Sequence, residues 1–209
     1  MKKKILSNYY LSIFACILAI VMVGCASTAA VVNEGAATVL PSGGIVVDPP
    51  HTIADATLTD QSGKPMHLTD LRGRVSIVFF GYTNCPDVCP ITVSDWTRVK
   101  KSLGPDADKA AFVFLSVDPA RDTPAKLATY LGAFDTSFIG LTTDLATVKK
   151  IGEDFGAIFT PPDAGGVIGH STSAYLIDSN LQIRVNYPVG TKPAAIATDI
   201  QNMLKNGGK

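Results

Sequence analysis

Apolar and polar residues follow two different periods along residues 51–209, one typical of strands and one typical of helices. Short and nearly continuous apolar runs predict buried strands at 74–80, 111–117 and 138–141. Longer stretches, most of which begin beside a proline or an aspartate, predict helices at 88–103, 124–132, 144–155 and 193–204. Asp122 and Asp144 are expected to cap two of these helices. Strands that alternate with helices predict an α/β domain.

Two hairpins are expected at the ends of this alternation. Residues 52–59 alternate apolar and polar side chains and lead into a turn at 61–64, which predicts a hairpin at the start of the domain. A second hairpin is predicted from residues 173–178 and 182–187. This order of elements is that of a thioredoxin-like fold in which residues 160–169, rich in glycine and proline, form an inserted loop or hairpin.

The first 24 residues have the pattern of an export signal. Lysines at 2–4 precede an apolar stretch, Leu11 to Val23, which is too short for a membrane span of about 20 apolar residues. The stretch runs into the letters MVGC, which end at Cys25 and resemble a bacterial lipobox. We therefore expect a lipoprotein signal peptide over residues 1–24 and a lipid on Cys25. An ordinary signal peptide or an uncleaved anchor are the alternatives.

A stretch of small, apolar and proline residues separates this signal from the domain. Residues 25–50 carry almost no charge and have neither a strand nor a helix period. The composition predicts a flexible tether between the lipid and a folded domain at residues 51–209. We therefore expect an exported, membrane-anchored protein that faces the extracytoplasmic side.

Charge excludes nucleic acid as a partner. The chain has 18 basic and 18 acidic residues, and loss of the three signal lysines leaves 15 basic ones. A near-neutral domain offers no basic surface for a phosphate backbone.

Two of the four cysteines remain in the folded part, since Cys16 lies in the signal and Cys25 is the lipidation site. A scaffold with several disulfides is therefore excluded. Cys85 and Cys89 follow a predicted strand and lie at the start of a predicted helix, where free amides and the helix dipole stabilise thiolates. Their four-residue spacing places both sulfurs on one helical face. Such a pair suits a disulfide or two ligands of one metal ion.

His170 is the candidate third ligand, because it follows the glycine-rich loop and directly precedes a predicted strand. Two thiolates and one imidazole form a soft donor set that suits copper, whereas structural zinc normally has four protein ligands. We therefore expect Cys85, Cys89 and His170 to bind one copper ion per chain, as Cu(I) or Cu(II). A structural disulfide is the alternative.

Four segments carry motifs of a known family. They are FGYTNCPDVCP at 80–90, SVDPARDTP at 116–124, GLT at 140–142, and His170 and Ser171 ahead of YLID at 175–178. This set resembles the Sco/SenC family. The resemblance implies a thioredoxin-like fold, copper held by the two cysteines and the histidine, and delivery of copper to the binuclear copper site of cytochrome c oxidase. Gly169 departs from the pattern, because many members have an acidic residue directly before the histidine. This difference concerns the groups around the metal ligands and not the ligands themselves.

Two roles remain open for such a site. The leading hypothesis is a metallochaperone, not an enzyme, whose partners are an upstream copper donor or thiol reductant and a copper-receiving oxidase subunit. The alternative is a thiol–disulfide oxidoreductase that keeps partner cysteines reduced, with Cys85 and Cys89 as its redox-active pair. A peroxidase ranks third, because no arginine is expected near the cysteines. His170 distinguishes the metallochaperone from the oxidoreductase, since thiol exchange does not need a histidine whereas copper binding does.

Overall fold

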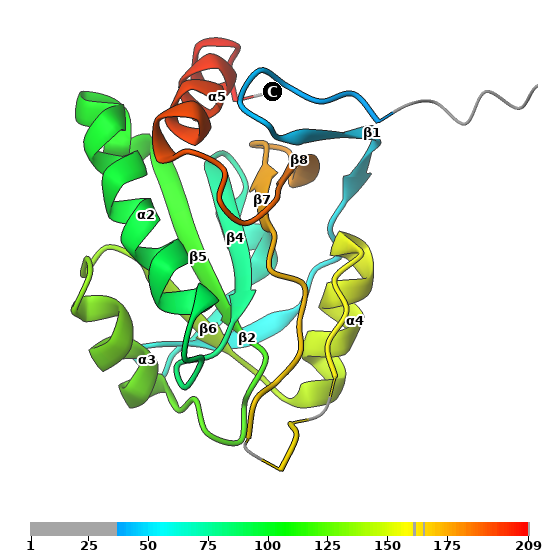
Figure 1. The fold of residues 1–209 in the computed structure, drawn as a ribbon, viewed down its shortest axis with the longest axis vertical. Helices are drawn as coiled ribbons and strands as arrows, with labels where there is room; N and C mark the ends of the chain where they lie inside the picture. Colours follow the sequence, from blue (N-terminus) through cyan, green and yellow to red (C-terminus); the bar gives the residue numbers. More distant parts are fainter. Residues whose placement is uncertain (1–36, 161, 165, 209) are drawn as a thin grey trace, which may run out of the picture. The chain divides into compact units, whose positions relative to one another are not determined.

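A mixed sheet of eight strands forms the centre of the domain, in the order β1-β8-β7-β4-β5-β6-β2-β3 (Figure 1). The computed structural model describes residues 37–160, 162–164 and 166–208. Its strands are β1 (Ile45–Thr52), β2 (Thr57–Asp60), β3 (Pro65–His67), β4 (Val75–Gly81), β5 (Ala110–Ser116), β6 (Ile139–Thr142), β7 (Ala174–Ile177) and β8 (Gln182–Tyr187). Strands β4, β5 and β6 run parallel, while β7 lies antiparallel to β4. Every residue of β4 and β5 is buried, which explains their continuous apolar runs.

Helices cover both faces of this sheet. They are α2 (Val88–Leu103), α3 (Pro124–Gly132), α4 (Leu145–Phe155) and α5 (Pro193–Lys205), with short 3-10 turns η1 (Leu68–Leu71) and η2 (Gly104–Lys109). Successive residues of β4 point to opposite layers. Phe79 packs against Trp96 of α2, with ring centroids 6.4 Å apart, and Phe80 packs against Phe155 of α4 at 5.0 Å. Figure 1 shows α2 and α3 on one side of β4 and β5, with α4 on the other. The predicted thioredoxin-like α/β fold is confirmed.

The ordered domain begins earlier than the sequence predicts. Residues 45–50 belong to β1, which pairs antiparallel with β8, and residues 38–44 form a turn that is hydrogen-bonded to the start of β1. The expected flexible tether over 25–50 is therefore wrong for residues 38–50. β1 is an edge strand with mostly half-exposed or exposed side chains, and edge strands tolerate prolines such as Pro49 and Pro50. It therefore lacks the alternation by which strands are recognised. The expected signal peptide over 1–24 and the lipid site at Cys25 lie outside the described residues.

One predicted helix cap is also wrong. Thr123, not Asp122, is the N-cap of α3, and its side chain accepts a hydrogen bond from the Lys126 amide at 3.3 Å. Asp144 caps α4 as predicted, through the Thr147 amide. Within the described residues, no helix is long and apolar enough to cross a membrane.

Candidate metal centre

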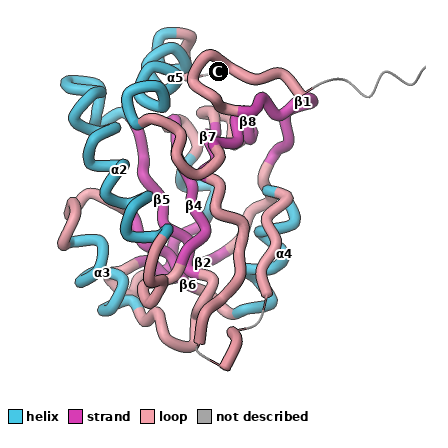
Figure 2. Tube along the Cα trace, in the orientation of Figure 1, coloured by secondary structure: helices cyan, strands magenta, loops and turns pink. Residues whose placement is uncertain are grey.

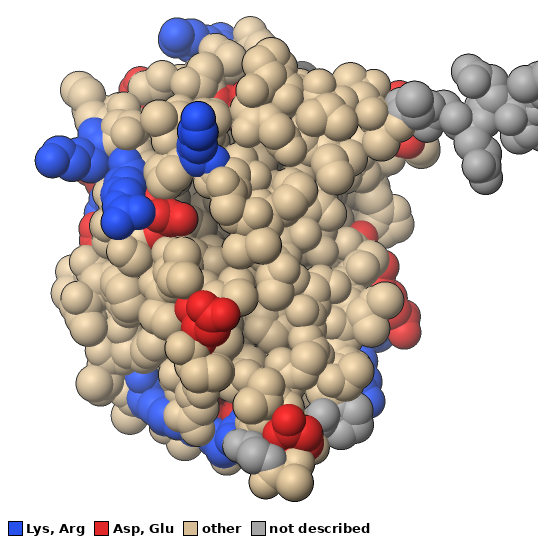
Figure 3. Space-filling model, in the orientation of Figure 1, with Lys and Arg blue, Asp and Glu red and all other residues tan. Residues whose placement is uncertain are grey.

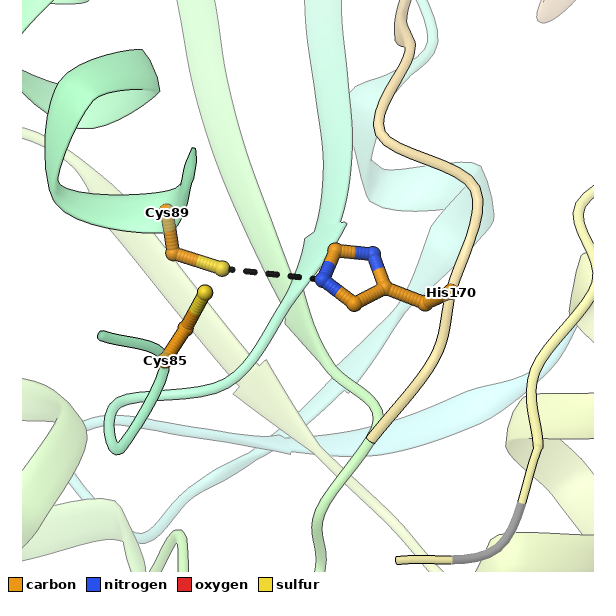
Figure 4. Close-up of side chains that lie close together, drawn as sticks. All are labelled: Cys85, Cys89 and His170. Carbon is orange, nitrogen blue, oxygen red and sulfur yellow. Dashed lines mark hydrogen bonds between the residues drawn. The ribbon is translucent and has the colours of Figure 1, made fainter. Parts of the chain in front are cut away.

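Cys85 lies on the turn that joins β4 to α2, and Cys89 lies at the start of α2 (Figure 4). The Cys85 amide donates to the Tyr82 carbonyl at 3.2 Å, which closes a turn before the helix. α2 begins at Val88, with Asp87 as its N-cap, so Cys89 occupies the first helical turn. Cys85 precedes the helix, so the prediction that a shared helical face brings the sulfurs together is wrong. The tight turn before α2 does this instead.

His170 lies beside the two cysteines, in the segment that leads into β7, the strand next to β4. It precedes β7, at the end of the long loop between α4 and β7 (Figure 2). In the antiparallel ladder of β4 and β7, Phe79 lies opposite Ala174. The C-terminal end of β4 and the start of β7 therefore lie side by side at one end of the sheet. This places His170 beside residues 82–89, which are called the cysteine turn below.

Three possible ligand atoms lie close together at this end of the sheet. The Sγ atoms of Cys85 and Cys89 and a ring nitrogen of His170 all lie within 4.8 Å of one another. Nε2 of His170 lies 3.8 Å from Sγ of Cys89 (Figure 4). The structure thus brings together the three residues that the sequence analysis selected, while their role as metal ligands stays a prediction.

The imidazole of His170 is held in the tautomer that a metal requires. Its Nδ1 lies 2.8 Å from the Ser171 carbonyl oxygen, which can only accept, so Nδ1 carries the proton. Nε2 then presents a lone pair toward Cys89. The rings of Phe79 and Tyr82 pack edge-on against the imidazole at 6.0 and 5.7 Å. Burial lowers the pKa of His170, with the Ser171 carbonyl acting in the opposite direction, so the neutral ring is favoured.

The two thiols differ in acidity. Burial opposes ionisation of the half-buried Cys85, but contacts with the amides of Asp87, Cys89 and Val88 and with the Cys89 thiol outweigh it and lower the Cys85 pKa. Burial, together with the negative charges of Cys85 and Asp122, raises the pKa of Cys89. The expected stabilisation of thiolates by the helix start agrees with the lowered pKa of Cys85, whereas burial outweighs it at Cys89. The Cys85 sulfur is thus partly exposed and has a lowered pKa, whereas the Cys89 sulfur is buried and has a raised pKa.

A buried carboxylate that sequence analysis assigned to a helix cap supports this turn. Asp122 has no exposed surface and accepts hydrogen bonds from the Thr83 amide at 3.0 Å, the Thr83 hydroxyl at 2.6 Å and the Ser116 hydroxyl at 2.7 Å. Thr83 lies two residues before Cys85, so Asp122 fixes the start of the cysteine turn. The motifs at 80–90 and 116–124 contain these residues, but nothing in their spacing shows that they pair.

Thr160 occupies the space beside Gly169. A Cβ added at Gly169 would lie 2.7 Å from Oγ1 of Thr160, closer than real Cβ contacts. The same hydroxyl accepts from the Gly169 amide at 3.1 Å and donates to the Gly169 carbonyl at 3.2 Å. Residue 169 therefore helps to close the hairpin that carries His170, and its backbone leaves no room for an acidic side chain without movement of Thr160.

An arginine lies near the cysteine turn, contrary to the prediction. The guanidinium carbon of Arg121 lies 5.9 Å from the centroid of the Tyr82 ring. Its nitrogens donate to the Asp118 carboxylate and to the Gly166 carbonyl, so they are engaged by this chain. The other histidines pair elsewhere, His51 with Asp154 and His67 with Asp55.

The face that carries the site has few charges. Figure 3 shows mainly uncharged surface over the segment that leads into β7, and an acidic side chain at the start of α2. Lysines and arginines gather instead toward the far end of α2 and over α3. This face of the molecule therefore presents no continuous basic surface around the cysteine turn.

Comparison with known proteins gives a consistent result. The SCO1/SenC family model matches residues 47–205. An SCO2-like protein of Rickettsia felis is 32% identical over 147 residues, which cover 68% of this chain and 72% of that protein.

Solved structures of similar proteins have the same fold. ScoI of Bradyrhizobium japonicum, with copper bound, is 34% identical with a TM-score of 0.66 over 72% of this chain and 98% of that one. A SCO1/SenC family lipoprotein of Bacillus anthracis is 30% identical, with a TM-score of 0.69 over 76% and 99% of the two chains. BsSco, described as having a disulfide switch and as a member of the Sco family of cytochrome c oxidase assembly proteins, is 25% identical, with a TM-score of 0.63 over 74% and 94%. With the family model matching most of its length, the chain belongs to the SCO1/SenC family.

Proposed function

We propose that this chain binds one copper ion through Cys85, Cys89 and His170 and supplies it to the binuclear copper site of cytochrome c oxidase. The observation that carries the proposal is the convergence of two sulfurs and one unprotonated imidazole nitrogen within 4.8 Å. Such a set suits Cu(I) and Cu(II), and the described residues add no fourth His, Cys, Asp or Glu ligand of the kind typical of structural zinc. The copper-bound Bradyrhizobium relative and the assembly role stated for BsSco support it.

The unequal thiols suit binding followed by transfer. Cys85 is partly exposed and its pKa is lowered, whereas Cys89 is buried, so copper from an upstream donor meets the Cys85 sulfur first. Cys89 must lose its proton on binding, because only the thiolate is a strong ligand. Three protein ligands leave one side open to a sulfur or imidazole of the receiving oxidase subunit. Exchange starts at Cys85, since Cys89 is enclosed by the protein.

A lipid on Cys25 would hold the domain at the extracytoplasmic face of the membrane. The sequence before Cys25 supports this, and the Bacillus anthracis relative is described as a lipoprotein. The Val46 amide donates to the Thr38 carbonyl, so the chain is already folded against β1 at residue 38, and the connection available as a tether ends before that residue.

Anaerobic titration of the reduced protein with Cu(I), with thiols counted before and after, tests the ligand set. We expect one equivalent per chain and loss of two titratable thiols on loading. Cys85→Ala, Cys89→Ala and His170→Ala should each weaken binding strongly. His51→Ala is the matched control, because His51 pairs with Asp154 away from the site. Copper binding by His170→Ala that equals the wild type would contradict the proposed ligand set.

A second function is reduction of partner disulfides. The observation that favours it is the pairing of an accessible, readily ionised thiol with an enclosed one, since the first can attack and the second can resolve a mixed disulfide. His170→Ala separates the two functions. Retained reduction of a disulfide-bonded partner peptide, together with lost copper transfer, would establish both roles in one protein.

A further inference from the structure

Arg121 connects the segment that carries His170 to the turn that carries the cysteines. Its Nε donates to the Asp118 carboxylate, in the turn that follows β5. Its Nη2 donates to the carbonyl of Gly166 at 2.7 Å. Its guanidinium carbon lies 5.9 Å from the centroid of the Tyr82 ring, within range of a cation–π contact. One side chain therefore touches three segments that are distant in sequence.

Tyr82 acts on the same segment as Arg121. Its hydroxyl oxygen accepts a hydrogen bond from the Ile168 amide at 3.2 Å, and only 1% of the residue is exposed. Its ring also packs against the imidazole of His170. The backbone is thus held at Gly166 by Arg121 and at Ile168 by Tyr82, four and two residues before His170.

The other hydrogen bonds of this segment have a different role. Thr160 pairs with Gly169, and the Ser171 amide donates to the Ile158 carbonyl at 2.9 Å. These bonds join the two sides of the hairpin to each other. Tyr82, Arg121 and His170 itself provide hydrogen bonds that join it to the cysteine turn and to the turn after β5.

We propose that Arg121 is a positioning residue for His170, which fixes the distance between Nε2 of His170 and Sγ of Cys89 without binding the metal. The proposal rests on the proposed ligand set. Arginine suits this task, because its rigid planar fork can donate in two directions while its face stacks on a ring. Lysine has one compact ammonium group and cannot maintain all three contacts, although it keeps the charge.

Arg121→Gln and Arg121→Lys test this in the reduced full chain. We expect both to weaken Cu(I) binding about 10–100-fold in an anaerobic competition with a chelator, the range seen when a partner that orients a ligand is lost. Gly166→Ala perturbs the same contact from the other side, because a Cβ there would lie 2.7 Å from Nη1 of Arg121. Arg98→Gln is the matched control, since Arg98 pairs on the surface with Asp95.

Spectroscopy separates positioning from a general loss of stability. In the Cu(II)-loaded Arg121 variants, nitrogen hyperfine coupling should weaken and the sulfur contribution to the copper X-ray absorption should persist. An unchanged nitrogen signal in both variants would overturn the proposal.

A double-mutant comparison distinguishes this proposal from the ligand set itself. In a His170→Ala background, Arg121→Lys should change copper affinity by less than about twofold, because its effect passes through the missing imidazole. An equal loss in both backgrounds would show that Arg121 acts on folding and not through the imidazole, and would overturn the positioning role alone. Wild-type affinity in His170→Ala would overturn the ligand set, and the positioning role with it.

Discussion

Replacement of Asp122 by alanine should cost more stability than loss of an ordinary surface carboxylate. The carboxylate is fully buried and accepts from the Thr83 amide, the Thr83 hydroxyl and the Ser116 hydroxyl. Asp122→Ala leaves the Thr83 amide and the enclosed Ser116 hydroxyl without an acceptor. Each stranded donor costs about 1–3 kcal/mol, so the free energy of unfolding should fall by about 2–6 kcal/mol.

Equilibrium unfolding in urea measures this loss. If the free energy of unfolding falls by about 2 kcal/mol per M urea, the urea concentration at the unfolding midpoint should drop by about 1–3 M. Asp106→Ala is the control, because Asp106 pairs with Lys109 on the surface and its loss should change stability by less than about 0.5 kcal/mol. Asp122→Asn should lie between the two, since it keeps one acceptor oxygen. A loss below about 1 kcal/mol for Asp122→Ala would refute the reasoning, because it would mean that water or a rearranged partner satisfies both donors.

Three further predictions concern the site and the edge of the sheet. Since the Cys85 pKa is lowered and that of Cys89 is raised, iodoacetamide should modify Cys85 first and at lower pH than Cys89. Peptide mass spectrometry that finds Cys89 modified first would contradict this. Gly169→Asp should destabilise the protein by about 1–3 kcal/mol in urea, and a second change, Thr160→Ala, should restore most of the loss because it removes the clashing hydroxyl. A shortened chain without β1 should melt at a lower temperature and aggregate more readily than one that begins at residue 37, because the edge of β8 is then uncovered; equal melting temperatures would show that β1 adds nothing.

Local patterns predict the interior of this fold well. α2 spans 88–103 in both the prediction and the structure, because apolar residues such as Trp96 recur along one face and Gly104 ends the helix. β4 and β5 are shifted by one residue or less from their predicted ranges, because both faces of each strand are buried. β1 could not be recognised, because an edge strand with half-exposed side chains has no hydrophobic period.

The site was predictable in its residue types but not in its supporting contacts. Paired cysteines at a strand end and a histidine before a strand already indicate a soft metal site. The role of Asp122 depends on Thr83, 39 residues away, and that of Arg121 on Gly166, 45 residues away. Both contacts arise only when β4, β5 and the segment before β7 are brought together. A local sequence pattern carries no information about such partners.

The antiparallel register between β4 and β7 sets the distance in space between Cys89 and His170. This distance therefore does not depend on the number of residues between them, which are 81 positions apart in the chain. Insertions and deletions in the connections from α3 to α4 can therefore accumulate without moving one ligand relative to the other. A single deletion among the three residues between His170 and Ala174 has the opposite effect, because it pulls the imidazole by about 3.3 Å, the length of one extended residue, away from the cysteine sulfurs. Tolerance of length changes in this domain should thus be lowest over these few positions.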